Sequence, residues 1–480
     1  MQSTLWNDLA AALPELWMLG AVCFVLVFDL FVPAARRDLT YWLVQATLAG
    51  ALVFTVAGHD GGRTLAFGGH YVVDEMAVLL KSAIYLVAGA VFLYSRPYLK
   101  DRGLFRGEYF VLGLFGVLGM MIMVSAHSFV SLYLGLELLA LSQYAMVAFF
   151  RDSLPASEAA MKYFVLGALA SGMLLYGMSV LYGTVGSLDI ATVANALSQE
   201  EGRSAFALFG LVFVVVGIAF KFGAVPFHMW VPDVYDGAPT SVTLYIGSAP
   251  KIAAFAMLMR LLSESLGPLT GDWGQLLAVL LVLSMAVGNI IAIAQRRIKR
   301  MLAYSTISHV GFLFFGVMAG TQEGYAAAMF YAIVYAAMAA GAFGMLLLMS
   351  RQGYEPEHID DFKGLNERHP WLAFLMLLLM FSMAGIPPTV GFYAKLAVIQ
   401  AAVNVGEVWI AVYAVVLSVI GAFYYLRVVK YMYFDKPEES HPVQPGMDAQ
   451  VIMGINGLAM LALGVFPGGL MALCLRAVGY

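Results

Sequence analysis

Long apolar segments recur along the entire chain, and they constrain its fold more than any other feature. About fourteen of them are long enough to cross a bilayer, which takes about 20 residues in a helix. They lie near residues 14–33, 41–58, 76–96, 107–126, 128–150, 158–183, 205–226, 240–263, 272–294, 300–319, 323–350, 370–403, 407–433 and 450–475. Because a segment in lipid must satisfy its own backbone hydrogen bonds, each is expected to be a helix. The sequence therefore predicts an all-α polytopic membrane protein with one integral membrane domain over residues 1–480.

The composition excludes a soluble protein and indicates no cofactor in this chain. Of 480 residues, 62% are hydrophobic and 12% are charged, whereas soluble domains are about 45–50% apolar and about 25% charged. The net charge of -4 implies no nucleic-acid partner. Cys23 and Cys474 are too few to ligate an iron–sulfur cluster or a structural zinc. No glycine-rich fingerprint follows a strand, so no nucleotide site is expected.

Lysine and arginine residues gather in every second loop, which predicts the orientation of the chain. One side collects Arg36, Arg37, Arg96, Lys100, Arg102, Arg106, Arg151, Arg296, Arg297, Lys299, Arg300, Arg351, Lys363, Arg368, Arg427, Lys430 and Lys436. The other side has Arg63, Arg203, Arg260 and Arg476. The loop 227–239 is an exception, because it should be basic and has neither residue type. Since basic loops face the cytoplasm, both termini are predicted outside, in the periplasm of a Gram-negative inner membrane.

Two predicted spans should be broken within the membrane. Prolines interrupt them at Pro226 and at Pro387-Pro388, where each removes a backbone donor and clashes with the preceding turn. Paired breaks five helices apart indicate inverted repeats, as in many transporters; two unrelated kinks are the alternative. We expect helices 1–3 within 1–105, repeats of five helices over 106–263 and 272–433, and a fourteenth helix at 450–475.

Few ionisable side chains remain inside the predicted spans. A charge at the bilayer centre costs about 2.5–3.5 kcal/mol, so such residues are functional candidates. The six are Lys81, Glu137, Lys221, Lys251, His309 and Lys395. The alternatives are a structural ion pair for Glu137, packing for His309, and snorkelling to the membrane surface for the lysines. Snorkelling is the favoured interpretation only for Lys81, which lies near the start of its helix.

Lysine is a suitable residue for binding and releasing a proton within a membrane. Burial disfavours its charged form, and a nearby carboxylate favours that form again, so moving the carboxylate would switch its proton affinity. Lys221 lies just before Pro226, Lys251 follows Pro250, and Lys395 follows the second break. Broken backbone at these places would admit water. His309 ends the hydroxyl-rich sequence YSTISH, which could carry a proton wire.

Four motifs carry a resemblance to a known family. They read LGLEL at 134–138, PFHMWVPDVYDGAP at 226–239, IKRMLAYSTISH at 298–309 and AGIPPTVGFYAK at 384–395. Over about residues 70–435 the chain resembles the subunit N family of bacterial respiratory complex I, the NADH-quinone oxidoreductase. Lys251 and Lys395 distinguish it from subunits L and M, which typically have His and Glu at the respective positions.

The resemblance implies a proton-pumping subunit of a translocase in the bacterial inner membrane. Glu137 and Lys221 would form an interacting pair, Lys251 and His309 a connecting relay, and Lys395 the terminal site. NADH, FMN, the iron–sulfur clusters and quinone would be bound by other subunits. The expected partners are other membrane subunits of the complex, including antiporter-like neighbours, together with lipid and protons.

Two other functions stay open at this point. The related Mrp-type cation/proton antiporters share the Glu–Lys pair and the broken helices, so an antiporter subunit is one alternative. A structural membrane scaffold is the other, although it leaves the costly mid-membrane charges without an explanation.

Overall fold

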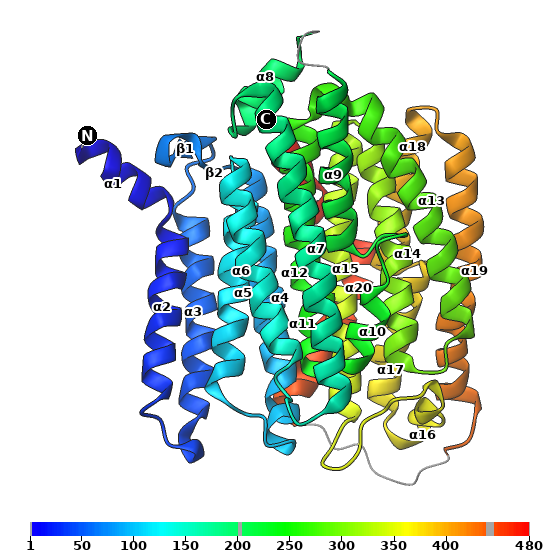
Figure 1. Ribbon diagram of the computed structural model, residues 1–480. Coiled ribbons are helices and arrows are strands. Elements are labelled where there is room, and N and C mark those ends of the chain that lie inside the picture. Colours follow the sequence, from blue (N-terminus) through cyan, green and yellow to red (C-terminus); the bar gives the residue numbers. More distant parts are fainter. Residues whose placement is uncertain (1, 200–203, 438–445, 480) are drawn as a thin grey trace.

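Helices running along one common axis form a single bundle in the computed structural model (Figure 1). The structure describes residues 2–199, 204–437 and 446–479. Within these residues, 12 helical segments are long and apolar enough to cross a membrane, or up to 13 with one bent pair. The predicted all-α polytopic fold is confirmed, and the one addition in the described chain is a small two-stranded hairpin.

The N-terminal part precedes the first predicted repeat. Its elements are α1 (Gln2–Ala11), α2 (Leu13–Asp29), α3 (Asp38–Ala57), β1 (Thr64–Ala66), β2 (Tyr71–Val73) and α4 (Glu75–Asp101). The first predicted span, 14–33, corresponds to α2, which α1 precedes at a bend of 71°. The antiparallel strands β1 and β2 lie between α3 and α4.

The middle of the chain contains the first interrupted helix. Its elements are α5 (Gly107–Ser125), α6 (Phe129–Val147), α7 (Leu154–Val185), α8 (Ile190–Leu197), α9 (Ala205–Phe222), α10 (Trp230–Gly237), α11 (Thr240–Gly247), α12 (Ala249–Leu258) and a π-helix (Met259–Ser265). The expected separation near residue 127 is confirmed, because Ser128 caps α6 by accepting a hydrogen bond from the Ser131 backbone.

The remaining helices contain the second interruption. They are α13 (Thr270–Ala294), α14 (Ile298–Met318), α15 (Gln322–Met349), α16 (Leu365–Arg368), α17 (Pro370–Ala384), α18 (Val390–Asn404), α19 (Val408–Phe434), α20 (Met447–Val465) and α21 (Gly468–Val478). The predicted span 370–403 is two short helices, α17 and α18, as the two prolines indicate.

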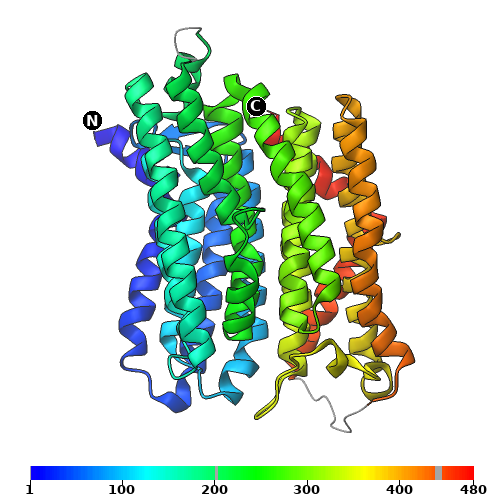
Figure 2. The same cartoon turned by 45° about the vertical axis from the view of Figure 1, so that its right-hand side comes forward.

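One expected loop is a helix. The segment 227–239 was expected to be an exposed connection, but α10 occupies most of it and continues the broken span begun by α9. Figure 2 shows the chain leaving its helical path here at mid-height of the bundle. Only Ala238 and Pro239 connect α10 to α11. Such a short connection leaves little room for basic residues, which explains the exception in the charge pattern.

The described ends of the chain lie at the same end of the bundle (Figure 1). The basic α15–α17 connection, with α16, lies at the opposite end. Arg203, counted among the charges of the other side, is outside the described residues. The span 240–265 occupies the centre of the bundle, and its apolar window is completely buried.

Candidate functional site

Each interrupted helix ends at a glycine with left-handed backbone. Gly223 follows α9 with φ 78°, and Gly385 follows α17 with φ 83°. A side chain is disfavoured in this conformation, which suits glycine at a helix end. Backbone carbonyls in the last turn of a helix have no partner within that helix, so both breaks expose acceptors inside the bundle.

Lys251 lies against the first break. Its Nζ atom donates a hydrogen bond to the carbonyl of Phe222, the last residue of α9, at 2.8 Å. The ammonium group also lies 5.6 Å from the ring centre of Trp230. Only 3% of Lys251 is exposed. A buried cation therefore lies at the C-terminal end of a half-helix, where the helix dipole is negative.

Lys395 lies against the second break in the same manner. Its Nζ atom donates hydrogen bonds to the carbonyl of Ala384, the last residue of α17, and to Ser418 Oγ, both at 2.9 Å. It lies 4.8 Å from the ring centre of Phe312. A methyl group at Gly385 would come within 2.8 Å of the lysine Cδ atom, so glycine also permits this close approach.

Glu137 and Lys221 line one cavity between α6, α7 and α9. The cavity volume is about 20 Å³, which is enough for roughly one water molecule. The carboxylate of Glu137 accepts a hydrogen bond from Ser171, whose hydroxyl oxygen also lies 3.0 Å from the hydroxyl of Tyr133. Lys221 Nζ donates instead to Gln143 Oε1, at 3.3 Å.

The expected contact between Glu137 and Lys221 is therefore indirect. Among the described residues, no carboxylate lies within salt-bridge distance of Lys221. Both side chains are half-buried and face the same cavity. A water molecule in that cavity, or a small side-chain movement, would complete the pair. The interaction itself stays a prediction.

His309 is held by two tyrosines. Its Nδ1 atom is 2.6 Å from the hydroxyl of Tyr331, and its Nε2 atom is 3.0 Å from the hydroxyl of Tyr425. The ring of Tyr331 stacks on that of Phe312, which lies next to the Lys395 ammonium. His309 and Lys395 thus belong to one continuous group of side chains.

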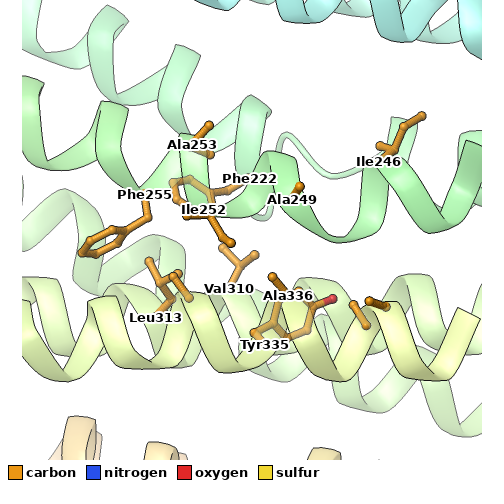
Figure 3. Close-up of a cluster of buried hydrophobic side chains, with 14 of the residues drawn as sticks. Phe222, Ile246, Ala249, Ile252, Ala253, Phe255, Val310, Leu313, Tyr335 and Ala336 are labelled. Atoms are coloured by element: carbon orange, nitrogen blue, oxygen red, sulfur yellow. The ribbon is translucent and has the colours of Figure 1, made fainter. Parts of the chain in front are cut away.

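The structure brings the five predicted residues into two groups. Glu137, Lys221 and Lys251 gather around the first break, because Trp230 both lines the cavity and contacts the ammonium of Lys251. His309 and Lys395 form the second group. Buried and mostly apolar side chains of α9, α11, α12, α14 and α15 form a cluster that includes Ile252, next to Lys251 in the chain, and Val310, next to His309 (Figure 3). No hydrogen bond joins Lys251 to His309 in the part of the chain that the structure describes.

The snorkelling interpretation of Lys81 is wrong. Only 3% of this residue is exposed, and its Nζ atom pairs with the carboxylate of Glu15 on α2. It also donates a hydrogen bond to the Tyr71 hydroxyl, at 3.0 Å. Because the ammonium group of Lys81 has a buried carboxylate partner, it does not need to reach the water at the membrane surface.

Two charges expected at the surface are buried. Arg260 is fully buried and binds both oxygens of Asp74, at 2.8 and 2.9 Å. It also contacts Glu264 and the carbonyl of Val124. Lys299, expected in an inner loop, is buried and donates to the carbonyl of Ala238.

Several functional groups escaped the sequence analysis. The carbonyls of Phe222 and Ala384 are backbone atoms, so no residue type reveals them. Gln143 and Ser171 are polar residues within apolar spans, and that signal could have identified them as contacts of the charged residues.

The chain is similar to membrane proteins of respiratory complexes. The family model described as "NADH:quinone oxidoreductase/Mrp antiporter, TM" matches residues 126–421. A protein named NADH-quinone oxidoreductase subunit N from Thioalkalivibrio sulfidiphilus is 62% identical over 474 residues, covering 98% of this chain and 99% of that protein.

Two solved structures resemble the entire bundle. A chain of respiratory complex I from Thermus thermophilus with bound aureothin is 30% identical, with a TM-score of 0.82, covering 96% of this chain and 98% of that chain. A chain of the Mrp complex from Dietzia sp. DQ12-45-1b is 20% identical, with a TM-score of 0.86, covering 98% of this chain and 97% of that chain. The latter likeness concerns the fold alone.

Proposed function

Because the chain belongs to the NADH-quinone oxidoreductase subunit N family, we propose that its buried charged row carries protons across the membrane. The chain is a membrane-arm subunit of this translocase, which couples electron transfer from NADH to quinone with proton translocation. The proposed row consists of Glu137, Lys221, Lys251, His309 and Lys395.

The contacts of Lys251 and Lys395 with the broken helices support this row most strongly. Each ammonium group has a backbone carbonyl as an acceptor, so its proton is held without a permanent carboxylate partner. A buried salt bridge would favour the charged state throughout the cycle. Without one, burial and movable neighbours can change how tightly the proton is held, as a relay requires.

Glu137 acts as the movable charge in this proposal. Its carboxylate lies in the same cavity as Lys221 without a direct ion pair. An approach of the two groups would favour the protonated lysine, and separation would favour proton release toward Lys251. His309 and Lys395 would then pass the proton toward the outer side.

We also propose the orientation and partners of the chain. Both termini face the periplasm, since the basic connections belong to the opposite end of the bundle. The partners are other membrane subunits of the complex, including antiporter-like neighbours. Two inverted repeats, 106–263 and 272–433, account for the similar breaks after Phe222 and Ala384.

The substitution Lys251→Met tests the proposed function, because it removes the charge and keeps an unbranched side chain. We expect NADH-driven proton uptake by inverted membrane vesicles to fall several-fold per assembled complex. Lys100→Met is the matched control, since Lys100 is an exposed lysine paired with Asp38 at the inner rim. Normal proton uptake in an assembled Lys251→Met complex would contradict the relay.

A further inference from the structure

The cluster of Figure 3 contains apolar side chains next to both Lys251 and His309, and such side chains cannot conduct protons. Ile252 follows Lys251 in the chain, Val310 follows His309, and both side chains lie in this cluster (Figure 3). Protons move along hydrogen-bonded oxygen and nitrogen atoms, so apolar side chains interrupt their passage. A path between the two groups therefore needs polar atoms beside the cluster.

Three buried hydroxyl groups lie within or beside it, and one of them belongs to Tyr335, a member of the cluster. Tyr335 of α15 donates a hydrogen bond to Thr306 Oγ1 of α14, at 2.7 Å. Thr306 in turn donates to the carbonyl of Leu302. The hydroxyl of Tyr235, on α10, faces Thr306 but has no hydrogen-bond partner among the described residues. All three side chains are at least nine-tenths buried.

Two of the three residues lie beside the two charged groups. Tyr235 lies on the Lys251 side, because its ring is 6.2 Å from that of Trp230, which contacts the lysine ammonium. Tyr335 lies on the other side, with its ring centre 5.0 Å from that of His309. The three residues come from separate helices and meet only through the fold.

The unpartnered hydroxyl of Tyr235 is free to bind a water molecule. Buried polar groups are almost always hydrogen-bonded, and an exception commonly marks an ordered water. A water molecule there would give Tyr235 a partner and shorten the gap to Thr306 or to Lys251.

We propose that the hydroxyls of Tyr235, Thr306 and Tyr335 form a bridge that carries protons from Lys251 to His309 around the apolar cluster. This proposal rests on the proposed relay. At rest Tyr335 donates to Thr306, and Thr306 donates to the carbonyl of Leu302, so passage toward His309 requires both hydroxyls to turn. Each oxygen then accepts a proton from the Lys251 side and releases its own proton toward His309, so no net charge stays on the bridge.

Two tyrosine-to-phenylalanine substitutions test the bridge in the intact complex. In inverted vesicles, Tyr235→Phe and Tyr335→Phe should each lower NADH-driven proton uptake several-fold per assembled complex. Tyr245→Phe is the matched control, because Tyr245 is also fully buried but its hydroxyl donates to the carbonyl of Gly113, outside the bridge. It should pump at the normal rate.

Tyr235→Phe separates a conducting role from a structural one. Because this hydroxyl has no protein partner, a structural role predicts normal pumping and an unchanged or higher melting temperature after its removal. The bridge predicts lost pumping with that same melting temperature. If Tyr335→Phe fails to assemble, Tyr235→Phe alone decides the question.

His309→Gln distinguishes failure of the bridge from failure of the relay. Normal pumping by both phenylalanine variants, with pumping lost in His309→Gln, would overturn the bridge alone. Normal pumping in His309→Gln as well would overturn the proposed relay on which the bridge rests.

Discussion

Lys251 and Phe222 meet where α9 ends, with the lysine Nζ atom 2.8 Å from the backbone carbonyl oxygen. Lys395 makes the equivalent contact with Ala384 at the end of α17. In both cases the lysine donates to a backbone carbonyl, an acceptor that cannot take up or lose a proton. The lysine therefore remains the only titrating member of each contact.

Lys395→Arg should impair pumping although it conserves the charge. Arginine stays protonated at physiological pH and cannot release a proton to the next group. Lys395→Ala removes the buried charge and should also lose coupling. A structural lysine would give the reverse order, with arginine tolerated and alanine damaging. Quinone reductase activity and proton uptake, each normalised to assembled complex, decide between the two orders.

Glu137→Gln should lower coupled proton pumping several-fold while the complex still assembles. The amide retains an oxygen that can accept the hydrogen bond from Ser171 but lacks the charge that acts on Lys221. Ser171→Ala is a useful comparison, because it removes the hydrogen bond and retains the carboxylate. Normal pumping by an assembled Glu137→Gln complex would show that this charge is not part of the mechanism.

Arg260→Met should destabilise the subunit by about 3–5 kcal/mol, because it leaves Asp74 buried without its bidentate partner. Adding Asp74→Asn removes the stranded charge and should restore part of the loss. Thermal inactivation of the purified complex measures both effects. Equal stability of the single and double variants would show that the stranded charge of Asp74 is not the cause of the loss.

Reporter fusions truncated after Arg102 and after Arg300 should both report a cytoplasmic location. The basic loops predict this result, because positively charged connections are retained on the cytoplasmic side. A fusion after Asn195, in α8, should report the periplasm and serves as the opposite control. A periplasmic signal at Arg102 would reverse the proposed orientation.

The membrane spans and their breaks could be predicted from the sequence because each depends on residues that are neighbours in the chain. Apolar length defines a span, and the prolines after Gly223 and Gly385 interrupt one. The contact of Lys81 with Glu15 could not be foreseen, since the two residues are 66 positions apart and come together only in the folded bundle. Arg260 was misplaced because an arginine near a helix end normally reaches water.

The proposed bridge between Lys251 and His309 could not be predicted from the sequence either. Tyr235 and Tyr335 resemble ordinary aromatic residues of a membrane interior, and their spacing in the chain carries no signal. Only their common contact with Thr306 separates them from the other tyrosines.

The interruption at Ser248, between α11 and α12, lies in the middle of a central span whose two ends are both held by polar contacts. At one end Thr240 is bound to Tyr98 and Glu355, and at the other Arg260 is bound to Asp74. With both ends held, the span 240–265 cannot slide along its own axis without breaking these contacts. We therefore expect backbone movement near Lys251 to be a local change at Ser248 rather than a displacement of the whole span.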